Sequence, residues 1–169
     1  MCKLKVSDFY YGAFLSAFLN NPRGLPSLFD ETDARNIYRL DTNNSDNGYI
    51  FYVKYKTKKS ADKKGRWHWS FSFSDSEIDT ILELHKQPSQ VKIALICVKD
   101  GFDDSELAII DYEPAMDCLG VTAGVKQYKI DIKTTPGKHG LRMYGSGRSD
   151  KVNGVDNTLP VSRQELTQL

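Results

Sequence analysis

Apolar and polar residues alternate along two segments in the first half of the chain, residues 49–57 and 66–74. In the first segment one face carries Tyr49, Phe51, Val53 and Tyr55. In the second segment one face carries Trp67, Trp69, Phe71 and Phe73, and the other carries His68, Ser70 and Ser72. A period of two is typical of a strand with one buried face. Because one polar loop separates the two strands, we predict that they form a β-hairpin.

Helical signals precede and follow these strands. Ser7 is a candidate N-cap for a helix that runs to about Asn20 and is apolar nearly all round. The sequence SDSE at 74–77 is a capping box that begins a second helix, and Asp111 begins a shorter third one. The nearly continuous apolar run at 91–98 predicts a central strand.

Together the segments predict the order α-β-β-β-α-β-β-α-β-β. Strands outnumber helices and hairpins join most of them, so we expect an α+β fold, a mostly antiparallel β-sheet with two main helices packed on it. The length of 169 residues fits one domain. Periodicity is lost after Gly145. We therefore assign residues 1–145 to a single α+β domain and residues 146–169 to a C-terminal extension or flexible tail.

The C-terminal hairpin is where the sequence is most explicit. Pro136 and Gly137 suit the centre of a two-residue turn. Counting outward from that turn pairs Ile132 with Leu141, Asp131 with Arg142, and Ile130 with Met143. The two apolar pairs then share one face, and Asp131 and Arg142 form a cross-strand charge pair on the solvated face. Gln127, Lys129 and Lys133 lie on that same face, so we expect a second, weakly basic surface there.

Composition narrows the class of protein only slightly. The net charge is +1, and the three cysteines show no CxxC or Cys/His spacing. Cys97 lies in the apolar run at 91–98 and is interpreted as a core thiol. The apolar segment near the N-terminus is too short to span a bilayer and has no cleavage site after it. These features favour a cytoplasmic protein with no membrane partner, and its compactness favours a bacterial or phage origin.

Common catalytic and cofactor motifs are absent from the sequence. There is no GxxxxGK[ST] segment, and the glycines of GSGRSDKVNG do not follow the dinucleotide-binding pattern. His68, His85 and His139 have no metal-ligand spacing, and no serine lies in a nucleophile elbow. For the histidines we favour structural or surface roles. We therefore predict no resident metal and no cofactor.

Charge is concentrated between the two alternating segments. Residues 54–66 hold seven basic side chains against Asp62, a net charge of +6. The basic residues are Lys54, Lys56, Lys58, Lys59, Lys63, Lys64 and Arg66. Such a hairpin tip can neutralise nucleic-acid phosphates or meet an acidic protein surface, and Tyr52 is a candidate for stacking on a base. The alternative is that a lysine-rich tip has no ligand and only protects the edge of the sheet from aggregation.

A second set of residues points to an enzyme. The order helix, three strands, helix, strand resembles the core of the PD-(D/E)xK nuclease superfamily. The resemblance covers about half of the chain, with Asp41 ending the first strand and Lys54 matching the lysine of the motif on the second. Tyr52 stands where the family has an acidic residue. The resemblance implies that carboxylates hold a divalent cation that activates the attacking water.

Three functions follow from the sequence. The leading hypothesis is a small non-catalytic binding module that contacts nucleic acid, or an acidic partner, through the basic hairpin at 54–66. The alternative is a metal-dependent nuclease, or a degenerate PD-(D/E)xK-like relic that binds without cutting. The third is a regulator or inhibitor that docks on another protein through its apolar first helix.

Overall fold

The computed structural model describes residues 3–20, 36–40, 47–58, 60–135, 137 and 140–161. The helices are α1 (Val6–Leu19), α2 (Asp75–His85) and α3 (Tyr112–Leu119). The strands are β1 (Ile37–Leu40), β2 (Tyr49–Lys58), β3 (His68–Phe73), β4 (Gln90–Lys99), β5 (Glu106–Asp111), β6 (Tyr128–Thr134), β7 (Leu141–Gly145), β8 (Lys151–Val152), β9 (Val155–Asp156) and β10 (Leu159–Val161). The predicted α+β class and the order of its ten elements are confirmed, and β8, β9 and β10 follow them.

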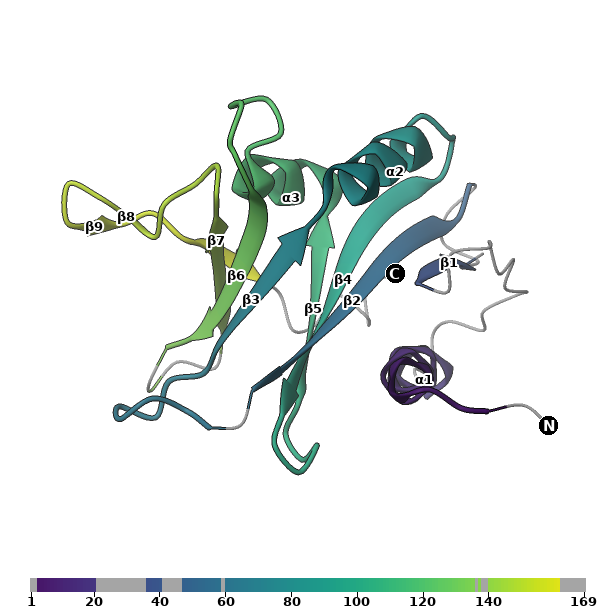
Figure 1. The fold of residues 1–169 in the computed structure, drawn as a ribbon, viewed down its shortest axis with the longest axis horizontal. Coiled ribbons are helices and arrows are strands. Elements are labelled where there is room, and N and C mark those ends of the chain that lie inside the picture. The colour runs from purple at the N-terminus through teal and green to yellow at the C-terminus, as the bar shows by residue number, and fades with distance from the viewer. Residues whose placement is uncertain are drawn as a thin grey trace.

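The strands form two four-stranded sheets and a short ribbon (Figure 1). The first sheet has the order β1-β2-β4-β5, and the second has the order β10-β7-β6-β3. β2 and β4 run parallel, because β3 and α2 form the connection between them, and the other pairings of the described strands are antiparallel. Strands β8 and β9 pair only with each other.

The predicted hairpin between the two alternating segments is wrong. β2 is bonded to β1 on one edge and to β4 on the other, so neither edge is open to β3. β3 instead pairs with β6, with Trp69 opposite Ile132 and Phe71 opposite Ile130. The basic segment therefore connects two different sheets. The alternation correctly identifies both strands, but it holds no information about which strand is the neighbour.

The first sheet is covered on both faces, and this sets the order of layers. On one face α1 buries Tyr10, Phe14 and Phe18 against apolar side chains of β2, β4 and β5. On the other face the second sheet, α2 and α3 enclose the larger core. β2 serves both layers: Phe51 and Val53 point toward α1, whereas Ile50 and Tyr52 point into the larger core.

The tryptophan of β3 joins the two sheets directly. Trp69 is 1% exposed, and its indole Nε1 donates a hydrogen bond to the backbone oxygen of Val98 on β4 at 3.0 Å. Phe71 and Phe73 lie on the same face of β3 and are also buried. The aromatic face of β3 is therefore the inner face of the second sheet, as the sequence indicates, and it packs against a strand of the first.

The predicted register of the C-terminal hairpin is wrong by two residues. Asp131 lies opposite Tyr144, and Arg142 lies opposite Lys133. Arg142 Nε donates to Thr158 Oγ1 at 2.8 Å, so it pairs with the C-terminal segment and not with Asp131. The four apolar residues of the predicted pairs do share the inner face, although they pair with other residues. The two-residue shift preserves that face, which explains why side-chain periodicity alone could not detect it.

Residues 146–161, which the sequence analysis places in an extension, contribute to the second sheet. β10 pairs with β7, and Val161 is buried in the larger core. A Cβ added to Gly147 would lie 2.3 Å from the Cα of Gly120, at the end of α3. This close approach requires glycine and seals the segment against the helix. Regular structure therefore continues beyond Gly145, and residues 162–169 lie outside the described chain.

No helix among the described residues is long and apolar enough to cross a membrane. Cys97 and Cys118 are free thiols that are fully buried, and burial raises the pKa of each thiol. The interpretation of Cys97 as a core residue is confirmed.

We expect Trp69→Phe to lower the free energy of unfolding by about 1–3 kcal/mol, because the buried oxygen of Val98 loses its donor and a cavity opens. Urea unfolding followed by circular dichroism measures the change. Trp67→Phe is the matched control, because the Trp67 side chain is only partly buried at the margin of the same core. Equal losses in the two variants would contradict the joining role of Trp69.

Candidate functional site

The segment between β2 and β3 forms a tight turn, which we name the basic loop (residues 60–66). The Gly65 amide donates to the Asp62 oxygen at 2.9 Å, and the Asp62 amide donates to the Arg66 oxygen at 2.8 Å. Gly65 has φ of 71°, a left-handed conformation that suits glycine. The two central positions of the turn are Lys63 and Lys64, which therefore lie at its tip.

The Asp62 side chain holds this turn in shape. Its Oδ1 accepts from the backbone amides of Lys64 and Arg66, each at 2.9 Å, and its Oδ2 accepts from Arg66 Nε at 2.7 Å. The Arg66 side chain and these amides lower the pKa of Asp62 to about 2. The charge of Arg66 is thus used inside the loop.

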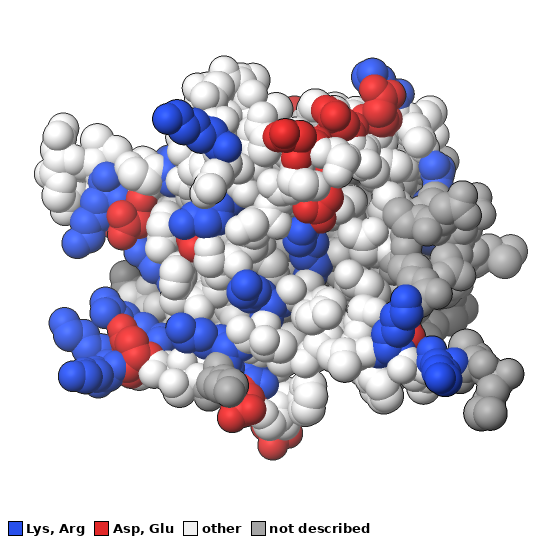
Figure 2. Space-filling model, in the orientation of Figure 1, with Lys and Arg blue, Asp and Glu red and all other residues white. Residues whose placement is uncertain are grey.

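The other predicted binding residues differ in whether a carboxylate forms an ion pair with their charge. Lys56, Lys58, Lys63 and Lys64 are exposed, and none of the described carboxylates forms an ion pair with them. Lys59 lies outside the described residues. Figure 2 shows the resulting cluster of blue side chains at the lower left, where the basic loop lies in Figure 1. Exposed acidic residues of α2, Asp75, Asp79 and Glu83, lie on the opposite, upper part of the molecule.

Tyr52 and Lys54 are held inside the fold. Tyr52 is 3% exposed, and its hydroxyl donates to Glu77 Oε1 at 2.8 Å, so the prediction that it stacks on a base is wrong. Lys54 Nζ lies 2.5 Å from the same Glu77 oxygen and 4.7 Å from the centre of the Phe73 ring. Burial alone would raise the pKa of Glu77, but hydrogen bonds from Lys54, the Ser74 amide and Tyr52 outweigh it and lower that pKa.

The nuclease resemblance loses part of its structural basis. β3 leaves the sheet of β1 and β2, so the three strands that carry the resemblance do not lie in one sheet. The ammonium of Lys54, the residue matched to the motif lysine, is already bound by Glu77 and by the Ser72 oxygen. Asp41 lies outside the described residues. Within the described ranges no group of three or more His, Cys, Asp or Glu side chains is arranged to hold a metal ion.

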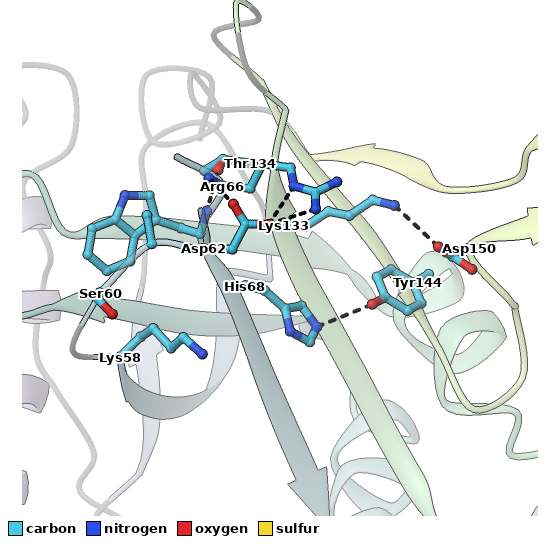
Figure 3. A pocket seen from close by; sticks show the side chains of 11 residues that line it. Lys58, Ser60, Asp62, Arg66, His68, Lys133, Thr134, Tyr144 and Asp150 are labelled. Atoms are coloured by element: carbon cyan, nitrogen blue, oxygen red, sulfur yellow. Dashed lines mark hydrogen bonds and ion pairs between the residues drawn. The ribbon is translucent and has the colours of Figure 1, made fainter. Parts of the chain in front are cut away.

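A pocket of about 410 Å³ opens between the basic loop and the outer face of the second sheet (Figure 3). Side chains from the end of β2 through the basic loop to β3, from β6 and β7, and from the segment after β7 border it. They are Lys58, Ser60, Ala61, Asp62, Arg66, Trp67, His68, Lys133, Thr134, Tyr144 and Asp150. The pocket thus combines the cations of Lys58 at the end of β2 and Lys133 on β6 with polar groups from β3 and β7.

One side of the pocket is formed by a histidine paired with a buried carboxylate. His68 Nε2 lies 2.9 Å from Asp131 Oδ1 and 3.2 Å from the Tyr144 hydroxyl. The Asp131 side chain is 1% exposed, and its Oδ2 lies 3.2 Å from Lys129 Nζ. Burial alone would raise the pKa of Asp131, but hydrogen bonds from His68 and Ser70 and the nearby charge of Lys129 outweigh it and lower that pKa. Asp131 is therefore a buried anion whose charge is held by its neighbours.

Lys133 brings a cation next to this histidine. Strand pairing places Lys133 directly opposite His68, so the two side chains share the outer face of the sheet. Lys133 Nζ lies 5.0 Å from the centre of the Tyr144 ring and 3.6 Å from Asp150 Oδ2. The latter distance exceeds that of a hydrogen bond, so Asp150 attracts the ammonium without fixing it.

Sequence reasoning missed this cluster. It assigned surface or structural roles to His68 and paired Asp131 with Arg142. The available signal was that His68 lies on the polar face of an alternating strand. What the sequence did not show was that β3 pairs with β6, which lies about 60 residues further along the chain.

The first helix exposes apolar side chains on its outer side. Val6, Phe9 and Leu19 of α1, and Leu4 just before it, are each between 61% and 69% exposed, whereas Tyr10, Phe14 and Phe18 are buried against the first sheet. This agrees with the expectation of a helix that is apolar nearly all round. Docking of another protein on α1 stays a prediction.

Comparisons with known proteins give no relative from which a role could be transferred. No family model, no curated protein and no solved structure matches this chain.

We expect the amides of Lys64 and Arg66 to report the charge of Asp62 in an NMR titration. Because the pKa of Asp62 is lowered, the charged hydrogen bonds of the turn are complete above pH 4 and are lost as the pH falls through about 2. In Arg66→Gln the midpoint should rise toward the ordinary value of 3.8, because the largest cause of the shift is removed. A midpoint near 3.8 in the unmodified protein would contradict this turn.

Proposed function

We propose that the protein binds nucleic acid through the phosphate backbone, with the basic loop and the adjoining end of β2 as the contact surface. One observation carries the proposal. Lys56, Lys58, Lys63 and Lys64 are exposed without a carboxylate partner among the described residues, and Lys58 also borders the pocket of the second sheet. Unpaired lysines on a convex loop beside a polar pocket attract a polyanion and release its counterions.

The arrangement supports binding that is independent of sequence. The contacts come from lysine side chains on a surface turn, and phosphate contacts fix position without distinguishing bases. Tyr52 is buried, and the Tyr144 ring is in contact with His68 and Lys133. The described aromatic residues near the loop are thus already engaged within the protein. We therefore expect similar affinity for different sequences of equal length and a steep dependence on salt.

Replacing Lys58, Lys63 and Lys64 together with glutamine should weaken binding to a short single-stranded oligonucleotide. The slope of log K against log salt should fall by about 2, because each phosphate that a lysine neutralises on a single strand adds roughly 0.7 to that slope. Fluorescence anisotropy at several salt concentrations measures this slope. The matched control replaces Lys3, Lys5 and Lys126, three exposed lysines outside the basic loop, and removes the same charge.

The control separates a local site from the effect of total charge. Equal weakening in the two triple variants would contradict a site at the basic loop. Competition with polyglutamate tests the other partner that the lysines could serve. Displacement of the oligonucleotide at equal charge concentration would favour an acidic protein surface over nucleic acid.

A further inference from the structure

The buried Asp131 fixes which nitrogen of His68 carries hydrogen. The carboxylate is charged and accepts at 2.9 Å, so Nε2 must be the N–H donor of the neutral ring. Nδ1 is then left with its lone pair, and the His68 side chain is 46% exposed. The Tyr144 oxygen shares the same N–H at 3.2 Å, which leaves its own hydroxyl hydrogen for another acceptor. An oriented imidazole with a free basic nitrogen therefore lies beside the pocket.

The surroundings of this base suit a reacting phosphate. Lys133 lies opposite His68 on the neighbouring strand, and Lys58 borders the same pocket. Figure 3 shows the Lys58 side chain extending from the end of β2 toward the His68 ring, with Tyr144 on the other side of that ring. Positively charged groups placed around a phosphate stabilise the additional negative charge of a five-coordinate transition state. The base and the cations come from different strands but meet in one cavity.

The cluster has a base and cations but no side chain activated as a nucleophile. Ser60 and Thr134 border the pocket, and Thr134 Oγ1 already accepts from the Trp67 amide at 2.8 Å. RNA differs from DNA in carrying its own nucleophile, the 2′-hydroxyl beside each phosphodiester. A base next to a phosphate site is therefore sufficient to start cleavage of RNA, whereas cleavage of DNA would need an additional nucleophile.

We propose that this pocket cleaves single-stranded RNA by internal transphosphorylation, with His68 as the general base. His68 Nδ1 takes the proton of the 2′-hydroxyl, and the 2′-oxygen forms a bond to phosphorus as the bond to the 5′-oxygen breaks. Lys133 donates a proton to the departing 5′-oxygen. The products are a 2′,3′-cyclic phosphate and a 5′-hydroxyl, and water returns the two protons to their starting positions.

Asp131 acts in this scheme as a positioning residue, because it touches His68 and not the substrate. Tyr144 donates its hydroxyl hydrogen to a non-bridging oxygen of the phosphate. This inference rests on the proposed function, since RNA must first be held by the basic loop. It departs from the non-catalytic role that the sequence suggests.

The test uses the full chain with a 5′-labelled single-stranded RNA in the presence of EDTA. We expect fragments that end in 2′,3′-cyclic phosphate, and a DNA strand of the same sequence that is bound but not cleaved. His68→Gln should slow cleavage about 100-fold or more while binding is retained, the usual range for loss of a general base being roughly 10²- to 10⁴-fold. His85→Gln is the matched control, because His85 stacks on Tyr112 outside the pocket. The His85→Gln variant should cleave RNA at the rate of the unmodified protein.

Tyr144→Phe gives a second variant that keeps the ring against His68 and removes only the hydroxyl, so slower cleavage with unchanged binding is expected. Circular dichroism confirms the fold of each variant. RNA binding without cleavage by the unmodified protein would overturn the catalytic inference and leave the proposed function standing. Cleavage that persists in His68→Gln would overturn it as well. Absence of both binding and cleavage would overturn both.

Discussion

The aromatic face of β3 is the constraint on which the rest of the structure depends. Trp69, Phe71 and Phe73 must be buried, and β2 offers no free edge where β3 could pair beside it. β3 therefore leaves the first sheet, pairs with β6, and lays its aromatic side chains onto the inner face of the sheet it has left. The hydrogen bond from Trp69 to Val98 ties the two sheets where their inner faces meet. Burial of three large aromatic residues is the main gain of this arrangement.

The same constraint creates the outer surface of the second sheet. Because strand side chains alternate, burying the aromatic face of β3 turns His68, Ser70 and Ser72 outward. Pairing with β6 then brings Asp131 and Lys133 to that outer face, and β7 adds Tyr144. The chain between β2 and β3 must cross from one sheet to the other, which places the basic loop at the rim of this polar surface. The pocket thus follows from core packing.

The sequence predicted what depends on local pattern and failed where partners are distant. The α+β class, the order of ten elements and the capping box at Ser74 and Glu77 could all be read from neighbouring residues. The β2–β3 hairpin was wrong because nothing in the alternation shows that β1 and β4 occupy both edges of β2. The Asp131–Arg142 pair was wrong because a shift of two residues preserves the apolar face. The cluster at His68 was missed because it depends on the pairing of β3 with β6, two strands that are distant in the sequence.

The buried charge of Asp131 is the feature that packing alone does not explain. Removing a carboxylate from water is costly, and replacing a buried ion pair by apolar groups is often neutral or stabilising. Here His68 lies next to one oxygen of the carboxylate and Lys129 next to the other. The same face carries Ser70 and Ser72, so uncharged polar side chains are sufficient for packing there. An exposed polar residue could pair with His68 at lower cost. A buried one additionally fixes the ring orientation and the position of its proton. A fixed ring and a fixed proton matter for a histidine that acts on a bound group. They bring no advantage to a histidine that is only a surface residue.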